Sequence, residues 1–514
     1  MPILSKILKN TYVDSMSLMA LSTKANKLPV VEQAMIGMGT DMNKQVIENV
    51  GLITEEIKTA SKADLIIVVQ SKSEDDLAKA FEAIEDLRTQ KVQDSDEDTQ
   101  TYSSVNQAMN EDEDSSLVIF SVPGEYVAAE AMKALEKDKH IMIFSDNVSV
   151  EDEIALKTYA HEKWLLVMGP DCGTAIINGV GLCFANKVRR GGIGIVGASG
   201  TGSQEVSSQI HNLGQGVSQL IGVGGRDLSE QVGGIMMSDG LSMLSGDDET
   251  QAIVLISKPP AKAVQEKMIE QATQAGKPVV ICFIGANLTG TKGNVVFARN
   301  TKEAALKAVE ALTGKTSAEN TDAYLQQLVN SHPAFAASQK YIRGLFAGGT
   351  ICDEVFYTIK DSGYAVASNV AGPVDARLQF GATLSGNAMI DFGSDEYTQG
   401  RPHPMIDPTF RAAAVIEQAK DPEVAVILMD FELGFGSNDN PVGVMIDTIK
   451  QAKAIASENG RHLEIVAYVL GTDEDFQDKA KQLAYLNEAG VATVNSAVDL
   501  GLIAVEYLNQ GKGN

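Results

Sequence analysis

The stretch GASGTGSQEV, residues 197–206, decides how this chain folds. It follows a short apolar strand at residues 193–197 and leads into a helix, and it holds three glycines and no charge before Glu205. A strand, a glycine-rich turn and a helix N-terminus together present several backbone N–H groups and the positive end of a helix dipole. The stretch therefore predicts an α/β domain whose first turn holds a small anion, phosphate above all.

A second turn repeats this pattern in the carboxy-terminal half of the chain. The pair GT at residues 200–201 is followed four residues later by EV at 205–206, and GT at 349–350 is followed in the same way by EV at 354–355. An apolar strand precedes the turn in both copies. Such internal repetition of a strand, turn and helix indicates two related domains.

Each turn has a second matching strand downstream, AIVLI at 252–256 and AVILM at 425–429. The second copy is longer than the first, and the stretch RPHPMIDP, residues 401–408, supplies part of the additional length. We therefore expect two related α/β domains over residues 191–313 and 338–510.

The chain before these domains reads as three further segments. Residues 1–90, with an apolar strand at 63–69, predict a small α/β domain. Residues 92–116 carry eight acids and no base, which predicts a solvated acidic linker over residues 91–116, or alternatively a segment that docks a partner. Residues 117–190 alternate apolar strands with helical stretches, as half of a parallel α/β sheet does.

The composition excludes several classes of function. Lys and Arg number 42 against 68 Asp and Glu, and the net charge of −26 repels nucleic acid and anionic membranes. No apolar run approaches the roughly 20 residues that cross a bilayer, and the first residues, MPILSKILKN, do not form a signal peptide. A cytoplasmic protein is expected. Its four cysteines are widely spaced and predict reduced packing residues, with Cys352 in a glycine turn left open as a reactive group.

Three glycine-rich turns are candidates for binding phosphate or a substrate oxyanion. Small residues allow an anion to approach the backbone closely, and backbone donors need no charged side chain. None of the turns is a GxxxxGK[ST] loop, and each could equally be a tight turn that holds no ligand. The candidate residues are Ser199, Gly200, Thr201 and Gly202; Gly348, Gly349 and Thr350; and Gly436, Ser437 and Asn438.

These motifs resemble the succinyl-CoA synthetase family. Similar to its α subunit are GPDC (169–172), GIGIVGASGTGSQE (192–205), GVGGRDL (222–228), AIVLIS (252–257) and KPVVICFIGAN (277–287). Similar to the last domain of its β subunit are GLFAGGTICDEV (344–355), NAMIDFGSDEY (387–397), DPEVAVILMDF (421–431) and GFGSND (434–439).

Within that superfamily the chain looks like a fused protein of the FdrA type, with YVDSMSLM (12–19) and RPHPMIDPTFR (401–411) as markers. The resemblance implies a multi-domain α/β fold. It consists of the small N-terminal domain, a Rossmann-like half domain of the CoA-binding type over residues 117–190, and two flavodoxin-like domains over residues 191–313 and 338–510.

Three departures from the synthetase change the expected chemistry. The synthetase carries phosphate on a histidine after its KPVV strand, whereas here the turn reads GANLTGTKGN, residues 285–294, without histidine. The glutamate that supports that histidine is replaced by Lys258. Residues 1–90 stand where the first half of the CoA-binding domain is expected, and no nucleotide-binding segment is present. The sequence thus predicts phosphate chemistry without a phosphohistidine or a certain cofactor, and leaves CoA binding open.

FdrA-type proteins are linked with anaerobic allantoin degradation, as subunits of an oxamate carbamoyltransferase. The resemblance therefore implies that the chain converts oxalurate and phosphate into oxamate and carbamoyl phosphate, together with other subunits. Two alternatives remain: an acyl-CoA ligase whose nucleotide domain comes from a partner chain, and a non-catalytic scaffold.

Basic side chains are expected to hold the carboxylate-bearing substrate, because arginine binds planar oxyanions in a fork. Arg401, His403 and Arg411 offer such charge, and Asp407 is expected to orient one of them. The prolines of this stretch equally predict a rigid loop, and they disfavour a helix that presents His403 and Asp407 together, so no metal site is expected. Arg226 is a further candidate for binding, with a surface arginine as the alternative.

Overall fold

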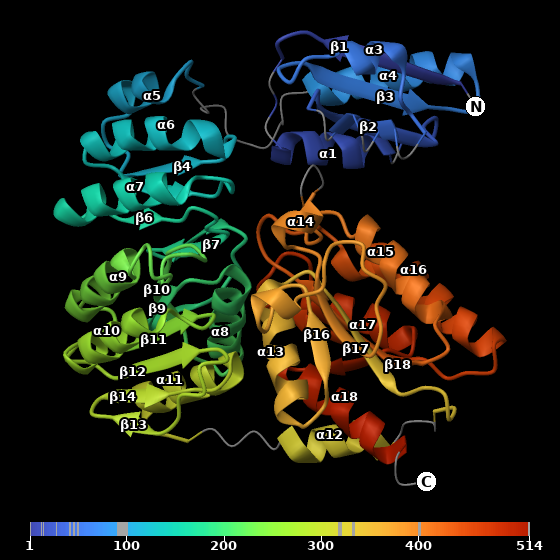
Figure 1. Ribbon diagram of the computed structural model, residues 1–514. Coiled ribbons are helices and arrows are strands. Elements are labelled where there is room, and N and C mark those ends of the chain that lie inside the picture. The colour runs from blue at the N-terminus through green and yellow to red at the C-terminus, as the bar shows by residue number, and fades with distance from the viewer. Residues whose placement is uncertain are drawn as a thin grey trace. The chain divides into compact units, whose positions relative to one another are not determined.

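A computed structural model of the chain describes most of its residues. The described ranges are 2–11, 13, 15–26, 28–40, 43–44, 47–48, 51–89, 101–316, 321–330, 335–398 and 402–511. The chain divides into two compact units (Figure 1). The first comprises Met1–Ser103 with Thr398–Pro402, and the second comprises Ser104–Tyr397 with His403–Asn514.

The first unit is a three-stranded antiparallel sheet in the order β1-β3-β2, with helices packed on it. Its central strand β3 is a continuous apolar run because both of its faces are buried: Leu65, Ile67 and Val69 face one core, and Ile66 and Val68 face the other. The elements are β1 (Ile3–Leu8), α1 (Ser15–Asn26), β2 (Gln33–Met38), α3 (Glu55–Thr59), β3 (Leu65–Gln70) and α4 (Glu74–Thr89).

The second unit begins with a parallel three-stranded sheet in the order β4-β5-β6. Its elements are α5 (Val105–Glu111), β4 (Leu117–Phe120), α6 (Gly124–Glu136), β5 (His140–Ile143), α7 (Val150–Glu162) and β6 (Val167–Met168). Helix α5 lies inside the stretch expected to be an acidic linker. Ser104 caps this helix by accepting a hydrogen bond from Gln107 N–H, and Met109 is buried in the core below it, so this part of the acidic segment is folded.

An eight-stranded sheet follows, in the order β13-β14-β12-β11-β9-β10-β7-β8. The parallel strands β10-β9-β11-β12-β14 have the strand order of flavodoxin, and β7 and β8 extend their edge antiparallel, so the sheet begins before residue 191. The strands are β7 (Thr174–Ile177), β8 (Val180–Cys183), β9 (Arg190–Gly197), β10 (Val217–Gly222), β11 (Ala252–Ser257), β12 (Val279–Phe283), β13 (Thr291–Lys292) and β14 (Val295–Phe297). The helices are α8 (Gly200–Asn212), α9 (Ile235–Gly246), α10 (Lys262–Thr273) and α11 (Thr301–Thr313).

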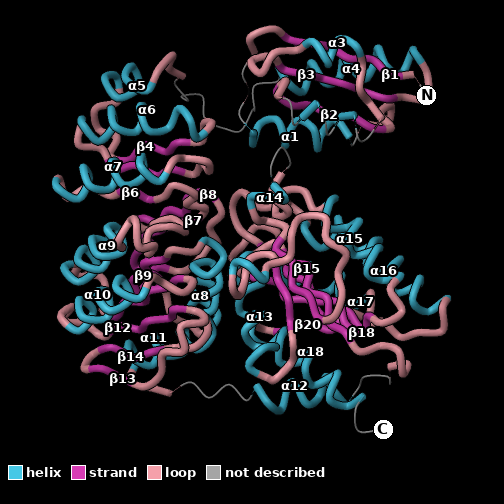
Figure 2. Tube along the Cα trace, in the orientation of Figure 1, coloured by secondary structure: helices cyan, strands magenta, loops and turns pink. Residues whose placement is uncertain are grey.

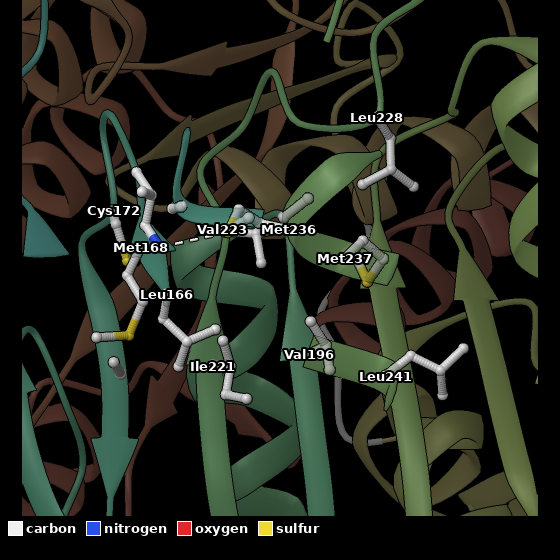
Figure 3. Packing of buried hydrophobic residues seen from close by; sticks show 14 of the residues in the cluster. Leu166, Met168, Cys172, Val196, Ile221, Val223, Leu228, Met236, Met237 and Leu241 are labelled. Atoms are coloured by element: carbon white, nitrogen blue, oxygen red, sulfur yellow. Dashed lines mark hydrogen bonds between the residues drawn. The ribbon is translucent and has the colours of Figure 1, made fainter. Parts of the chain in front are cut away.

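The three-stranded and eight-stranded sheets share one hydrophobic core (Figure 3). Met168 at the end of β6 and Val196 on β9 belong to the same buried cluster, and Val167 N–H donates a hydrogen bond to the Met236 sulfur at 3.3 Å. Cys172 packs in this core, and burial raises the pKa of its thiol to about 12. The cysteine is thus a packing residue, as the sequence predicts.

The last domain is a six-stranded parallel sheet in the order β16-β17-β15-β18-β19-β20, with helices on both faces (Figure 2). Its strands are β15 (Tyr341–Phe346), β16 (Val366–Ser368), β17 (Asn387–Asp391), β18 (Val424–Glu432), β19 (Glu464–Leu470) and β20 (Ala492–Val494). Its helices are α12 (Thr321–Asn330), α13 (Gly349–Asp361), α14 (Asp395–Thr398), α15 (Thr409–Lys420), α16 (Pro441–Glu458), α17 (Lys479–Glu488) and α18 (Ala497–Gly511), with a short 3-10 helix at Val374–Ala376. The fold class predicted from the sequence, a multi-domain α/β protein with two flavodoxin-like domains, is confirmed, although β17 lies between β16 and β15 in the second sheet and departs from the flavodoxin strand order.

Each flavodoxin-like domain supplies a hydrogen-bond acceptor to the N-terminus of a helix in the other domain. Glu205 on α8 accepts hydrogen bonds from Ala497 N–H at the start of α18, at 3.3 Å, and from the Tyr468 hydroxyl, at 2.5 Å. Glu354 on α13 accepts from Thr301 N–H at the start of α11, at 2.5 Å, and from the Thr301 hydroxyl, at 2.8 Å. The two glutamates of the internal repeat therefore tie the two domains together.

Within the ranges given above, every helix is too short or too polar to traverse a lipid bilayer.

Candidate functional site

The two repeated glycine turns face each other in the second unit. Helix α8 follows β9 and helix α13 follows β15, each at the point where the strand order of its sheet reverses, which is where open α/β sheets bind ligands. The hydroxyls of Ser199 and Thr350 hydrogen-bond to each other, and Thr350 N–H donates to the Thr201 hydroxyl at 3.2 Å. A Cβ on Gly202 would lie 2.9 Å from the Ser199 hydroxyl and 3.0 Å from the Thr350 methyl group, so any larger residue here would have to push these side chains aside.

Several backbone donors remain at these two helix N-termini. Gly202 N–H is capped by the Ser199 hydroxyl at 3.1 Å. The N–H groups of Gly200, Thr201, Gly349 and Ile351 have no acceptor among the residues that the structure describes. We call these four groups the paired cradle. Because helix N-termini also carry partial positive charge, the paired cradle suits a small oxyanion.

A buried ion pair supports the second turn from behind. Ala347 N–H and Gly348 N–H each donate to the Asp430 carboxylate at 2.8 Å. Arg411, which is 2% exposed, donates through Nη1 to Asp430 Oδ1 at 2.7 Å and to the Asp430 carbonyl at 2.8 Å. Arg411 was expected to bind substrate directly. The structure places it as a brace for Asp430, and its Nε has no hydrogen-bond partner among the described residues.

Lys258 brings a positive charge beside the paired cradle. It follows β11, forms an ion pair with Asp353 Oδ2 at 2.9 Å, and its Nζ lies 3.6 Å from the position that a Cβ on Gly349 would take. Burial lowers the pKa of Lys258, but the carboxylates of Asp353 and Asp391 outweigh it and hold the pKa above its usual value. Its side chain is 42% exposed, so this ammonium is charged and within reach of a ligand.

Two carboxyl groups at strand ends lie against the second turn. Burial raises the pKa of Asp391, at the end of β17, to about 7, although Lys258 opposes this shift. Burial and the neighbouring Asp430 raise the pKa of Glu432, at the end of β18, well above its usual value. A Cβ on Gly349 would lie 2.7 Å from Asp391 Oδ2, and one on Gly348 would lie 2.8 Å from Glu432 Oε1.

With a pKa of about 7, Asp391 can exchange a proton near neutral pH, as a general acid or base must. Neither Asp391 nor Glu432 is among the candidate residues that the sequence predicts. An acid directly after a buried apolar run, as in NAMID and VILMDFE, is the signal that could have found them.

The loop of the RPHPMIDP stretch contributes a neutral imidazole. Burial, and then the charge of Arg411, lower the pKa of His403 to about 4, so the ring does not supply the positive charge expected of it. It lies 5.8 Å from the ring of Phe184, and Asp407 N–H donates to the His403 carbonyl at 3.0 Å. Arg401 lies outside the described residues. Among those described, no cluster of three or more potential ligands could hold a metal ion.

The third glycine turn packs on this loop. Asn438 donates through its backbone N–H to the Met405 carbonyl and through its side chain to the Ile406 carbonyl, both at 2.9 Å. A Cβ on Gly436 would lie 2.9 Å from the Phe184 ring. Ser437 is buried with its hydroxyl unpaired. The contacts of Gly436 and Asn438 are thus made with neighbouring loops, and a role in binding phosphate stays a prediction.

Arg226 belongs to a different ion network. It pairs with Glu153 Oε2 at 2.9 Å and donates to the Val148 carbonyl at 2.8 Å, and its side chain is 44% exposed. Lys157, completely buried, joins Glu153 to Asp227 at 2.8 Å each. The cation of Arg226 is therefore already engaged in structural contacts.

The comparisons with known families divide the chain into three matched segments. Residues 1–104 match the model described as AllF, heavy metal-associated domain; residues 188–285 match the CoA binding domain; and residues 345–501 match CoA-ligase. The first 104 residues contain no cysteine and no histidine, so methionine is the one soft side-chain ligand in this segment.

Similar proteins were found over the whole chain and over parts of it. "Uncharacterized protein YahF" of Escherichia coli K12 is 52% identical over 98% of both chains. A succinate–CoA ligase [ADP-forming] subunit alpha 2 of Archaeoglobus fulgidus is 29% identical over 42% of this chain and 78% of its own length. The solved structure of PH0766 from Pyrococcus horikoshii OT3 matches 81% of this chain and 88% of its own at 17% identity, with a TM-score of 0.31.

Proposed function

Because the chain belongs to the family of YahF and carries CoA-binding and CoA-ligase domains of the acyl-CoA synthetase-like superfamily, we propose that it transfers a carbamoyl group to inorganic phosphate. The resemblance to FdrA-type proteins supplies the substrate: oxalurate and phosphate would give oxamate and carbamoyl phosphate. The observation that carries the proposal is the paired cradle beside Lys258, which provides four free backbone donors and a charge for one phosphate.

The reaction needs positioning rather than a covalent enzyme intermediate. An oxygen of hydrogen phosphate attacks the carbamoyl carbon of oxalurate. The bond that breaks joins this carbon to the nitrogen that it shares with the oxalyl group. The proton of hydrogen phosphate moves to the departing nitrogen, so that oxamate and dianionic carbamoyl phosphate result. With its pKa raised to about 7, Asp391 is suited to relay that proton, and the cradle stabilises the charge on the phosphoryl oxygens.

The histidines of the chain support a route without a phosphohistidine. They stand at positions 140, 161, 211, 332, 403 and 462, and none lies in the turn after β12. His403 is the one in the RPHPMIDP loop, and with a pKa of about 4 its ring is neutral. Lys258, in place of a carboxylate, favours binding a phosphate rather than orienting an imidazole.

The second candidate is an acyl-CoA ligase that works with a separate nucleotide-binding subunit, and the CoA-binding and CoA-ligase matches favour it. The purified protein, alone and with candidate partner subunits, is mixed with oxamate and carbamoyl phosphate, and phosphate release is followed. Release without CoA or nucleotide is expected. Release only with CoA, or formation of an acyl thioester, would replace the proposal with the second candidate.

A further inference from the structure

A cavity of about 210 Å³ lies beyond the carboxyl ends of β19 and β20, where the first flavodoxin-like domain covers the second. Gln209 and Asn212 on α8 line it from one side, and Lys479 at the start of α17 and Asn495 after β20 line it from the other. Small molecules often bind at the carboxyl ends of parallel strands and in pockets between domains.

This cavity is separate from the paired cradle. The cradle lies at the first turn of α8, and the cavity lies at its last turn. At 1.5 Å per helical residue the two are roughly 15 Å apart along the helix. None of the residues lining the cavity belongs to the cradle or to the groups beside it, so the inference does not depend on the proposed function.

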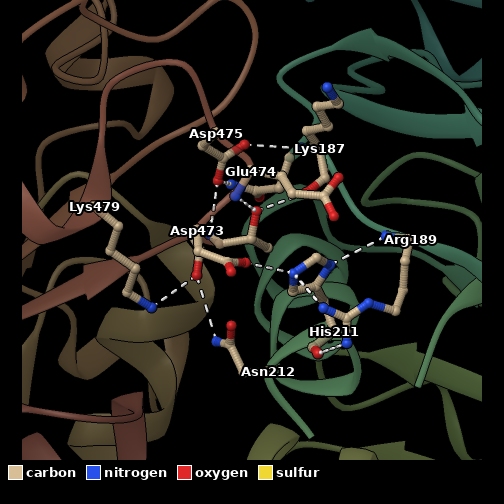
Figure 4. A network of polar contacts seen from close by, with 11 residues as sticks. Lys187, Arg189, His211, Asn212, Asp473, Glu474, Asp475 and Lys479 are labelled. Atoms are coloured by element: carbon tan, nitrogen blue, oxygen red, sulfur yellow. Dashed lines mark hydrogen bonds and ion pairs between the residues drawn. The ribbon is translucent and has the colours of Figure 1, made fainter. Parts of the chain in front are cut away.

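Lys479 is the cation among the residues that line this cavity, and its ammonium group has no direct ion-pair partner among the described residues. Its Nζ donates to the Gly471 carbonyl at 2.7 Å, a carbonyl that Asn212 also reaches at 3.4 Å (Figure 4). In the part of the chain that the structure describes, no carboxylate lies within 4.0 Å of this ammonium. Burial lowers the pKa of Lys479, although the charges of Glu205, Asp475 and Asp473 oppose this shift without cancelling it.

The nearest carboxylates already have donors of their own. Asp473 pairs with His211 Nε2 at 2.7 Å (Figure 4), and Asp475 accepts from Lys187 N–H and Thr472 N–H at 2.8 Å each. Glu205, as described above, is held by a tyrosine hydroxyl and a helix N–H. An ammonium that keeps two donors open toward a cavity favours an anionic guest.

Beside Lys479 and the amide side chains of Gln209, Asn212 and Asn495, the wall has an apolar part. Val469, Leu483 and Val494 contribute aliphatic side chains, and no aromatic ring is among the lining residues. A guest therefore needs a negative group at one end and a short aliphatic part at the other. We propose that this cavity binds a short-chain aliphatic carboxylate, with its carboxylate on Lys479 and its alkyl group against Val469, Leu483 and Val494.

Calorimetric titration of the full-length protein with butyrate, in the absence of phosphate, tests the proposal. Butyrate is expected to bind, and butyramide, which has the same shape but no charge, to bind about tenfold more weakly. Lys479→Met should weaken butyrate binding by a similar factor. Lys481→Met, two residues along the same helix and exposed, is the matched control and should bind butyrate as the unaltered protein does.

Circular dichroism establishes that each variant is folded. Should Lys479→Met fail to fold, Leu483→Phe provides the second test, because it fills the apolar end and is expected to abolish butyrate binding. Three results would overturn the proposal: no butyrate binding by the unaltered protein at millimolar concentration, equal binding of butyramide, or unchanged binding in folded Lys479→Met or Leu483→Phe.

Discussion

The two turns of the internal repeat share a sequence pattern but are built differently. At the start of α8, Ser199 caps the helix with its own hydroxyl. At the start of α13, the corresponding Gly348 has no side chain to cap the helix, and the Asp430 carboxylate on a neighbouring strand, itself held by Arg411, instead accepts from Ala347 N–H and Gly348 N–H just before the helix. The first turn is thus a local, neutral structure, whereas the second depends on a buried ion pair. The two turns therefore share their backbone donors, but the charged groups around these donors differ between the two sheets.

The strongest way to break the second turn alone is Arg411→Met. Removing one partner of a buried ion pair leaves the carboxylate of Asp430 uncompensated and should lower the free energy of unfolding by about 3–5 kcal/mol. Denaturant titration measures this loss. Arg299→Met removes an exposed ion pair with Asp361 and should change stability by less than about 1 kcal/mol. Equal effects of the two variants would show that the brace contributes nothing special.

The glutamates that follow the two turns predict how stability depends on pH. Burial raises the pKa of Glu354 to about 8 and that of Glu205 to about 7, and the charge of Glu205 adds to the shift of Glu354. Groups whose pKa is raised by folding stabilise the fold fully below the unfolded value, and this stability is lost as the pH rises through the folded value.

Thermal unfolding should therefore move to lower temperature as the pH rises from about 4.5 to 8, with a slope of at most about 1.4 kcal/mol per pH unit for each group. Glu354→Gln keeps an acceptor for Thr301 and should flatten this profile. A profile that is equally steep in the variant would remove Glu354 as its source.

Charge at the first turn tests whether the turns bind an anion. Gly200→Asp places a carboxylate among the donors of the paired cradle, and the position has room, because a Cβ there would lie 3.5 Å from its nearest neighbour, the Thr174 hydroxyl. Phosphate should bind at least about tenfold more weakly to this variant, which calorimetry measures. Gly200→Asn, of the same size and uncharged, is the control. Unchanged affinity in Gly200→Asp would exclude this turn from the site.

The smallest expected effect concerns the link between the turns. Ser199→Ala removes both the helix cap and the hydrogen bond to Thr350, and should cost about 1 kcal/mol for the cap alone. Ser149→Ala removes the cap of α7, where Ser149 accepts from Asp152 N–H, and touches no second domain. A larger loss for Ser199 in denaturant titration would measure the link; equal losses would show that the turns contact without mutual stabilisation.

The sequence predicted the buried parallel strands well, because such strands are continuous apolar runs. AIVLI and AVILM lie within β11 and β18. The short strands β7 and β8 were missed because they are only four residues long, and β7 is buried at three positions while β8 is exposed at one and half-buried at three. Helix α5 was missed because the surrounding acids concealed its one buried apolar residue, Met109.

The site was predictable where its chemistry is local. Glycine, serine and threonine in a turn already indicate backbone donors, and both repeated turns do face each other. The groups that surround them could not be found in this way. Asp430 reaches Gly348 from 82 residues along the chain, and the neutral state of His403 depends on burial and on Arg411. Such distant pairings follow from the order of strands in the sheet and not from the spacing of residues.

Glu205 and Glu354, each of which accepts hydrogen bonds from the other flavodoxin-like domain, have a consequence for the evolution of this protein. Helix α11, the last of the first flavodoxin-like domain, begins on Glu354, and α18, the last of the second, begins on Glu205. A gene that encoded either half alone would produce a polypeptide whose final helix lacks its terminal acceptor. Each half therefore depends on the presence of the other, fused or associated, for these hydrogen bonds at the start of its last helix.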